Sequence, residues 1–116
     1  MATIGIEGLI FHGYHGVFKE EAALGGRYEV SVYLEAGIDQ AAETDAVRHT
    51  VDYGAVYAYV AQEMARPRKL IETLAHGLAQ GLLARFALAE SVRVRVVKFS
   101  PPVGGVCERA FVDYTF

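Results

Sequence analysis

Apolar and polar residues alternate most regularly between Arg27 and Ile38. Every second position in this segment is apolar, and most of the positions between them are polar or charged. The apolar set consists of Tyr28, Val30, Val32, Leu34, Ala36 and Ile38. Because successive side chains of a β-strand point to opposite faces, this pattern predicts a half-buried antiparallel strand.

Three other segments carry the same two-residue period in a weaker form, namely 3–14, 91–99 and 109–116. The shared apolar face consists of Ile4, Ile6 and Ile10 in the first segment and of Val92, Val94 and Val96 in the second. A glycine-flanked turn at 12–16 ends the first segment, because paired glycines favour turns. We predict a strand for each of the three segments.

A helical period replaces this alternation between residues 53 and 86. Asp52 is a residue type that caps helices, so we predict a first helix over 53–65 that ends before Pro67. Its buried face consists of Val56, Val60 and Met64. A second helix is predicted over 70–86, with a broad apolar stripe. That stripe consists of Leu70, Ile71, Leu74, Ala75, Leu78, Leu82 and Phe86.

The resulting order, β-β-α-α-β-β, favours the α+β class. We expect one four-stranded antiparallel sheet with both helices on one face, in a single domain over 1–116. Such a sheet has two open edges, which pair readily with another copy of the chain. The hydrophobic fraction of 53% and the mean hydropathy of +0.21 also indicate apolar surface that a second copy covers.

Composition narrows the possible functions. The net charge is −3 and no basic stripe is present, which argues against a nucleic-acid partner. The sequence has neither a signal-peptide pattern nor an apolar run of ~20 residues, so we expect no membrane partner. Cys107 is the only cysteine, which fits a cytoplasmic protein without disulfides. The four histidines offer no set of three convergent ligands, so no metal site is expected.

Lys98 interrupts the valine face of the segment 91–99. It follows Val96 on that face, where the pattern calls for another apolar residue. One interpretation is a lysine in a partly desolvated cleft, where burial favours the neutral form and aids proton transfer. The other is that the strand ends here and the ammonium extends to water. The alternation alone favours the second interpretation.

Other polar residues have both a structural and a chemical interpretation. Glu72 lies in the first turn of the second helix, where a carboxylate stabilises the helix dipole. It is also an acceptor that can bridge two parallel N–H donors. Tyr53 begins the first helix and can donate a proton, whereas Glu21 is by default a solvated charge. The segment 100–105 combines two prolines with two glycines, as a loop over a ligand does.

Taken together, four segments resemble the dihydroneopterin aldolase family over nearly the whole chain. They are Gly13–Val17 with Glu21, Asp45 with Thr50–Tyr53, Leu70–Ala75, and Val94–Lys98 leading into Pro101 and Pro102. The resemblance implies the tunnelling fold (T-fold), in which subunits join edge to edge into a barrel. It also implies a homo-oligomer, tetramer or octamer, with active sites between subunits.

The reaction implied by the resemblance belongs to folate biosynthesis. 7,8-Dihydroneopterin is cleaved by a retro-aldol step to 6-hydroxymethyl-7,8-dihydropterin and glycolaldehyde. No cofactor, metal or lysine Schiff base is implied, because the C=N group of the pterin itself can accept the electrons. Lys98 would be the general acid/base, and Tyr53 would contact the substrate and help to reprotonate the intermediate. The pterin would be bound by Glu72 and the backbone at Ile71, and its hydroxylated side chain by Glu21.

Two alternatives remain at this stage. A 2′-epimerase that acts on dihydroneopterin or its triphosphate would use the same acid/base residues. A non-catalytic pterin-binding oligomer would be expected to lack them. The loop after Lys98 departs from the family pattern at Ser100, where Asn is common, and at Gly104, where Pro is common.

Overall fold

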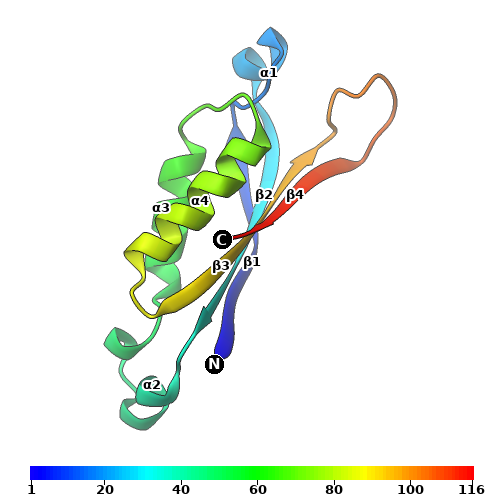
Figure 1. Cartoon of the computed structure of the whole chain (residues 1–116). Coiled ribbons are helices and arrows are strands. Elements are labelled where there is room, and N and C mark those ends of the chain that lie inside the picture. Colours follow the sequence, from blue (N-terminus) through cyan, green and yellow to red (C-terminus); the bar gives the residue numbers. More distant parts are fainter.

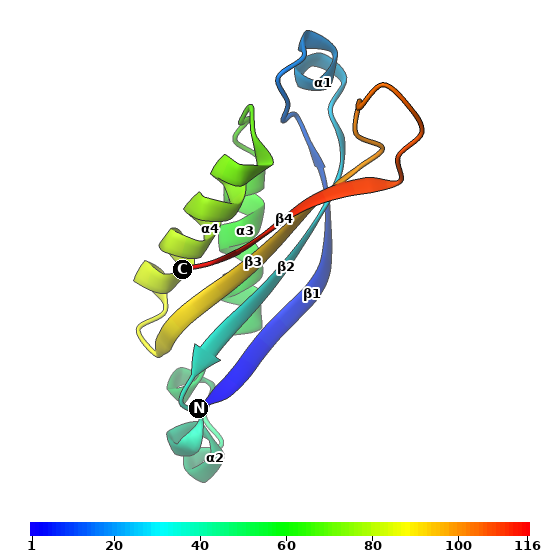
Figure 2. The ribbon, with the colours of Figure 1, turned by 45° about the vertical axis from the view of Figure 1, so that its right-hand side comes forward.

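The computed structural model describes residues 1–116, and a twisted four-stranded antiparallel sheet runs along the whole molecule (Figures 1 and 2). Its strands are β1 (Ala2–Gly13), β2 (Gly26–Ala36), β3 (Ala89–Phe99) and β4 (Arg109–Thr115), paired in the order β1-β2-β3-β4. Both long helices, α3 (Tyr53–Met64) and α4 (Ile71–Arg85), cover the same face of this sheet. The predicted α+β architecture is therefore confirmed.

The core lies between that face and the two helices. Val30, Val32 and Leu34 of β2 are buried opposite Val96, Val94 and Val92 of β3. From the helices, Val56, Val60 and Met64 of α3 and the predicted stripe of α4 pack onto these rows, apart from Leu70, which precedes α4 and is exposed. The same register places Lys98 directly across from Tyr28, at the end of the apolar rows.

Local capping sets where α3 begins. The Asp52 side chain accepts a hydrogen bond of 2.9 Å from the backbone N–H of Gly54, which confirms it as the N-cap. Three short helical segments lie in the connections between the predicted strands and helices, where the sequence pattern predicted no element. They are α1 (Lys19–Leu24), α2 (Asp39–Thr44) and the 3₁₀ turn η1 (Val47–His49). None of the helices is long and apolar enough to cross a lipid bilayer.

The predicted face of β1 is wrong at Ile10. The pairing of β1 with β2 shifts by one residue between Ile6 and Leu9, where Gly8 takes a positive φ of 72°. An extra residue in a strand reverses the side to which all later side chains point. Leu9 and Phe11 therefore pack against the core, and Ile10 is 46% exposed.

Candidate active site

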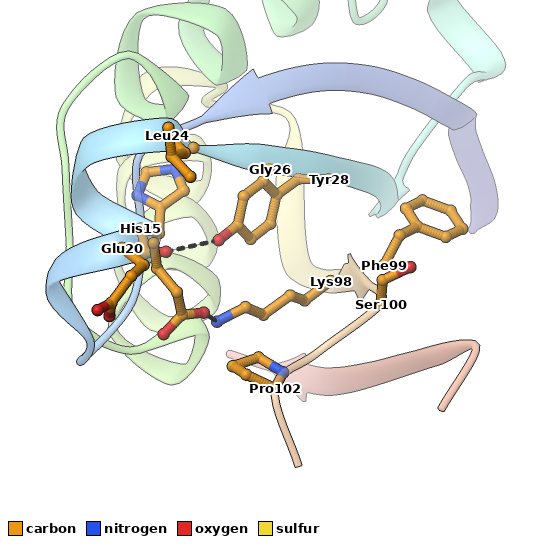
Figure 3. A pocket seen from close by; sticks show the side chains of 11 residues that line it. His15, Glu20, Leu24, Gly26, Tyr28, Lys98, Phe99, Ser100 and Pro102 are labelled. Atoms are coloured by element: carbon orange, nitrogen blue, oxygen red, sulfur yellow. Dashed lines mark hydrogen bonds and ion pairs between the residues drawn. The ribbon is translucent and has the colours of Figure 1, made fainter. Parts of the chain in front are cut away.

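Two adjoining hollows meet at Lys98 and Glu21, at the end of the molecule that carries α1. The first, which we call the α4 cleft, has a volume of about 230 Å³, and its lining includes Glu21, Lys69, Ile71, Glu72, Lys98 and Pro102. The second, the α1 cavity, has a volume of about 200 Å³, and its lining includes His15, Glu20, Glu21, Tyr28, Lys98 and Ser100. Figure 3 shows His15, Tyr28 and Lys98 around the α1 cavity.

Lys98 and Glu21 form an ion pair that separates the two hollows. Both side chains are largely covered, with 19% and 15% of their surface exposed, and the Lys98 ammonium contacts the Glu21 carboxylate. Burial works against ionisation of Glu21, but hydrogen bonds from Lys98 and from the Phe18 backbone outweigh it and lower the pKa of this carboxyl. The Lys98 side chain thus pairs inside the protein and does not extend into water.

The backbone at Gly16 allows Glu21 to reach this position. Gly16 has a φ of 146°, and a Cβ added there would overlap the carboxyl group of Glu21. Only glycine tolerates both the conformation and the close approach. The short helix α1 then begins at Lys19 and turns Glu21 back toward Lys98, with Phe18 N–H donating to Glu21 Oε1 at 3.3 Å.

Ile71 and Glu72 form the opposite wall of the α4 cleft. They are the first two residues of α4, and Glu72 is exposed at the helix N-terminus. The first backbone N–H groups of a helix have no acceptor within it, so this end of α4 offers both donors and a carboxylate acceptor. The cleft therefore brings together Glu21, Ile71, Glu72 and Lys98, which are four of the five predicted site residues.

Tyr53 is the predicted site residue that does not line the α4 cleft. It is the first residue of α3 and is 61% exposed. Only residues 65–70 separate the end of α3 from the start of α4, so the C-terminal end of α3 lies near the cleft. At ~1.5 Å per residue, the 12 residues of α3 put Tyr53 roughly 18 Å from that end, at the opposite end of the helix.

His15 and Tyr28 are polar residues in this region that the sequence did not single out as site residues. Both are only 1% exposed, and the Tyr28 hydroxyl donates to the His15 carbonyl at 2.8 Å. Burial, reinforced by the charge of Glu21, raises the pKa of Tyr28 to about 12. Burial also lowers the pKa of His15 below its usual 6.5. Two features of the sequence could have pointed to these residues: Tyr28 stands at the end of the valine row of β2, and His15 lies in the glycine-flanked turn at 12–16.

The loop after Lys98 takes an unusual backbone path at both departures from the family pattern. Ser100 has a φ of 49° and Gly104 a φ of 89°. Asn visits the left-handed region more readily than Ser does, so Ser100 holds the turn at a higher conformational cost than the usual Asn. A backbone hydrogen bond of 2.9 Å from Ser100 N–H to the Glu108 carbonyl closes the base of this loop.

Comparison with known proteins identifies the group to which these features belong. The family model described as "FolB: Dihydroneopterin aldolase" matches residues 4–115. A dihydroneopterin aldolase of Bacillus subtilis (strain 168) is 35% identical over 117 residues, covering 99% of this chain and 97% of the relative. The crystal structure of E. coli dihydroneopterin aldolase in complex with neopterin matches with a TM-score of 0.90 at 23% identity, covering 100% of this chain and 99% of that one.

A second solved structure shares the fold. It is a dihydroneopterin aldolase from Burkholderia thailendensis bound to guanine, with a TM-score of 0.79 at 24% identity. The match covers 99% of this chain and 89% of that one.

Proposed function

Since the chain belongs to the dihydroneopterin aldolase family, we propose that it cleaves 7,8-dihydroneopterin in the α4 cleft. The products are 6-hydroxymethyl-7,8-dihydropterin and glycolaldehyde, and the step belongs to folate biosynthesis. The observation that carries this proposal is the convergence of a paired lysine and two carboxylates on one cleft, namely Lys98, Glu21 and Glu72.

Glu72 and the backbone at Ile71 bind the pterin ring in this proposal. A carboxylate only accepts hydrogen bonds, and its two oxygens match the amino group and the adjacent ring N–H of a pterin. The solved relatives support this assignment, because one holds neopterin and another holds guanine. Both ligands present an amino group beside a ring N–H, which is the pattern that one carboxylate can bridge.

Lys98 moves protons near the hydroxylated side chain of the substrate. The reaction removes a proton from a side-chain hydroxyl, breaks the adjacent C–C bond toward the C=N group of the pterin, and returns a proton to the enamine-like intermediate. Lys98 serves as general acid/base through a water molecule, and Glu21 holds both Lys98 and the substrate hydroxyls. Because the pterin accepts the electrons, the proposal requires no cofactor, metal or Schiff base.

Tyr53 comes from a neighbouring subunit in this proposal. Its position at the far end of α3 keeps it from the cleft of its own chain, and its side chain is exposed. The sheet edges β1 and β4 are open, so copies of the chain can join edge to edge. We infer a homo-oligomer, tetramer or octamer, in which each site combines Lys98 of one subunit with Tyr53 of another.

Mixed oligomers test this shared site. Lys98→Ala and Tyr53→Ala, each inactive alone, should regain activity when the two chains are co-expressed and the mixed oligomers are isolated. Random assortment gives intact sites in about a quarter of the interfaces of a symmetric assembly. Activity no higher than that of the separate variants would show that Tyr53 does not act across the boundary.

A matched pair serves as the control for that experiment. In a mixture of Lys98→Ala and Glu72→Ala chains, an intact cleft would need Lys98 and Glu72 from the same chain. No chain in that mixture carries both residues. This mixture is therefore expected to stay inactive, because Lys98 and Glu72 line the cleft of the same chain.

The basic cluster at 66–69 bears on the epimerase alternative. Arg66 and Arg68 both form ion pairs with Glu63, at 3.2 and 3.5 Å. These pairs reduce the positive charge available to a triphosphate. Dihydroneopterin without phosphates therefore remains the favoured substrate.

A further inference from the structure

Two hydrogen bonds to the backbone of Arg68 connect the segment before α1 to the loop before α4. The Gly16 N–H donates to the Arg68 carbonyl at 2.9 Å, and the Arg68 N–H donates to His15 Nδ1 at 3.0 Å. Arg68 lies three residues before Ile71, where α4 begins. The neighbouring residues His15 and Gly16 thus pair with the backbone N–H and the backbone carbonyl of the same residue, Arg68.

The Arg68 bond fixes the protonation state of His15. A nitrogen that accepts a hydrogen bond carries no proton, so the neutral ring bears its proton on Nε2. A second proton on Nδ1 would point at the Arg68 N–H, and the bond would be lost. The His15–Arg68 bond therefore exists only while His15 is neutral, whereas the bond from the Gly16 N–H to the Arg68 carbonyl does not depend on the imidazole.

The His15 ring is held on its other sides by the sheet. The Tyr28 ring packs against it edge-on at 4.9 Å between centroids, and the Tyr28 hydroxyl donates to the His15 carbonyl at 2.8 Å. A Cβ at Gly13 would lie 2.7 Å from the ring, so no larger residue fits there. Tyr28 also stands directly opposite Lys98 in the sheet. The ring thus has one orientation, set by the strand pair that carries Lys98.

We propose that His15 is a positioning residue that holds the two walls of the α4 cleft at a fixed separation. One wall carries Lys98 and Glu21 on the sheet and α1, and the other carries Ile71 and Glu72 on α4. His15 contacts the first wall through Tyr28 and fixes the second through Arg68. The role deepens the proposed function and rests on it, since the walls must bind the pterin and cleave its side chain together.

Loss of the His15–Arg68 bond has a distinct expected effect. The pterin would still find Glu72, but its side chain would no longer meet Lys98 in the reactive geometry. A misplacement of ~1 Å can cost about 10²-fold in rate. We therefore expect kcat for dihydroneopterin cleavage to fall more than the affinity for neopterin.

A matched pair of amides provides the test. The His15→Asn side chain carries an acceptor oxygen close to the position of Nδ1, whereas His15→Gln carries its polar end near Nε2. The Asn variant should keep kcat within about threefold of wild type and the Gln variant should lose about 10-fold or more. The proposal would be overturned if kcat fell in His15→Asn but not in His15→Gln, or if both variants kept the kcat of the wild type.

Hydrogen exchange separates this inference from the proposed function. Amide protons of the loop 65–70 should exchange faster in His15→Gln than in wild type or His15→Asn, whatever the protein catalyses. Unchanged exchange in the Gln variant would contradict the role of His15. Failure of the wild type to cleave dihydroneopterin would contradict the proposed function and leave the exchange result interpretable.

Acid pH supplies a second readout. Burial lowers the pKa of His15 in the folded protein, a backbone hydrogen bond with Met64 opposes this, and the positive charges of Arg68 and Lys98 add to the lowering. The carboxylate of Glu21 lines the same cavity. In the unfolded chain His15 has its usual pKa of 6.5, so it binds a proton more readily there than in the folded protein. The folded state therefore loses stability as the pH falls from 6.5 toward the lower pKa of folded His15. The stability of His15→Asn should not fall in this pH range. A stability–pH profile identical to that of the wild type would contradict the proposal. The lowered pKa of Glu21 acts in a separate window, below 4.5.

Discussion

Replacing Lys98 by alanine should lower kcat for cleavage of 7,8-dihydroneopterin by about 10²-fold or more, the scale of a general acid/base group. Neopterin binding should change little, because Glu72 and the start of α4 remain in place on the opposite wall of the cleft. Steady-state turnover and a neopterin titration of the same preparation measure the two effects. Near-normal turnover in Lys98→Ala would remove Lys98 from the mechanism.

Two variants control for side effects of that change. Removing Lys98 leaves the Glu21 carboxylate largely buried without its partner, which itself costs stability. The double variant Lys98→Ala/Glu21→Gln removes the unpaired charge and should remain as slow as Lys98→Ala. Lys69 also lines the cleft but is exposed, so Lys69→Ala should stay within a few-fold of wild type. A comparable loss in Lys69→Ala would point to a general charge effect.

The second large effect is expected from Glu72→Ala, which should raise the Kd for neopterin by about 10²-fold or more. Two hydrogen bonds to a charged carboxylate are lost, each worth roughly 1.5–3 kcal/mol, and each ~1.4 kcal/mol corresponds to a factor of ten in Kd. The fold should persist, because the helix dipole loses only about 0.3–1 kcal/mol. Isothermal titration measures the change.

Related glutamate variants sharpen this test. Glu72→Gln keeps the size of the side chain but turns one acceptor into a donor, so it should also bind neopterin weakly. Glu20→Ala removes a first-turn glutamate of α1 outside the α4 cleft and should leave the Kd unchanged. An unchanged Kd in Glu72→Ala would contradict its role in pterin binding.

Much of the fold follows from local signals. The alternation in β2 and β3, the apolar stripes of α3 and α4 and the cap at Asp52 each depend on a few neighbouring residues. The bulge at Gly8 depends on how β1 pairs with β2, so alternation along β1 alone misplaced Ile10. A helix of six residues, such as α1, is too short to show a helical period.

The candidate site depends on longer-range contacts. Alternation singled out Lys98, but its ion pair with Glu21 requires that α1 fold back across Gly16. His15 meets Arg68, 53 positions away, which no local pattern announces. The family resemblance named five site residues, of which four line the α4 cleft, and the position of Tyr53 in α3 shows that one chain does not bring all five together.

Product analysis with 7,8-dihydroneopterin tests the central claim most directly. The wild-type protein should release 6-hydroxymethyl-7,8-dihydropterin and glycolaldehyde in equal amounts, measured by chromatography of the pterins and a separate assay of the aldehyde. Formation of the 2′-epimer without glycolaldehyde would contradict the account and assign the Lys98 site to epimerisation.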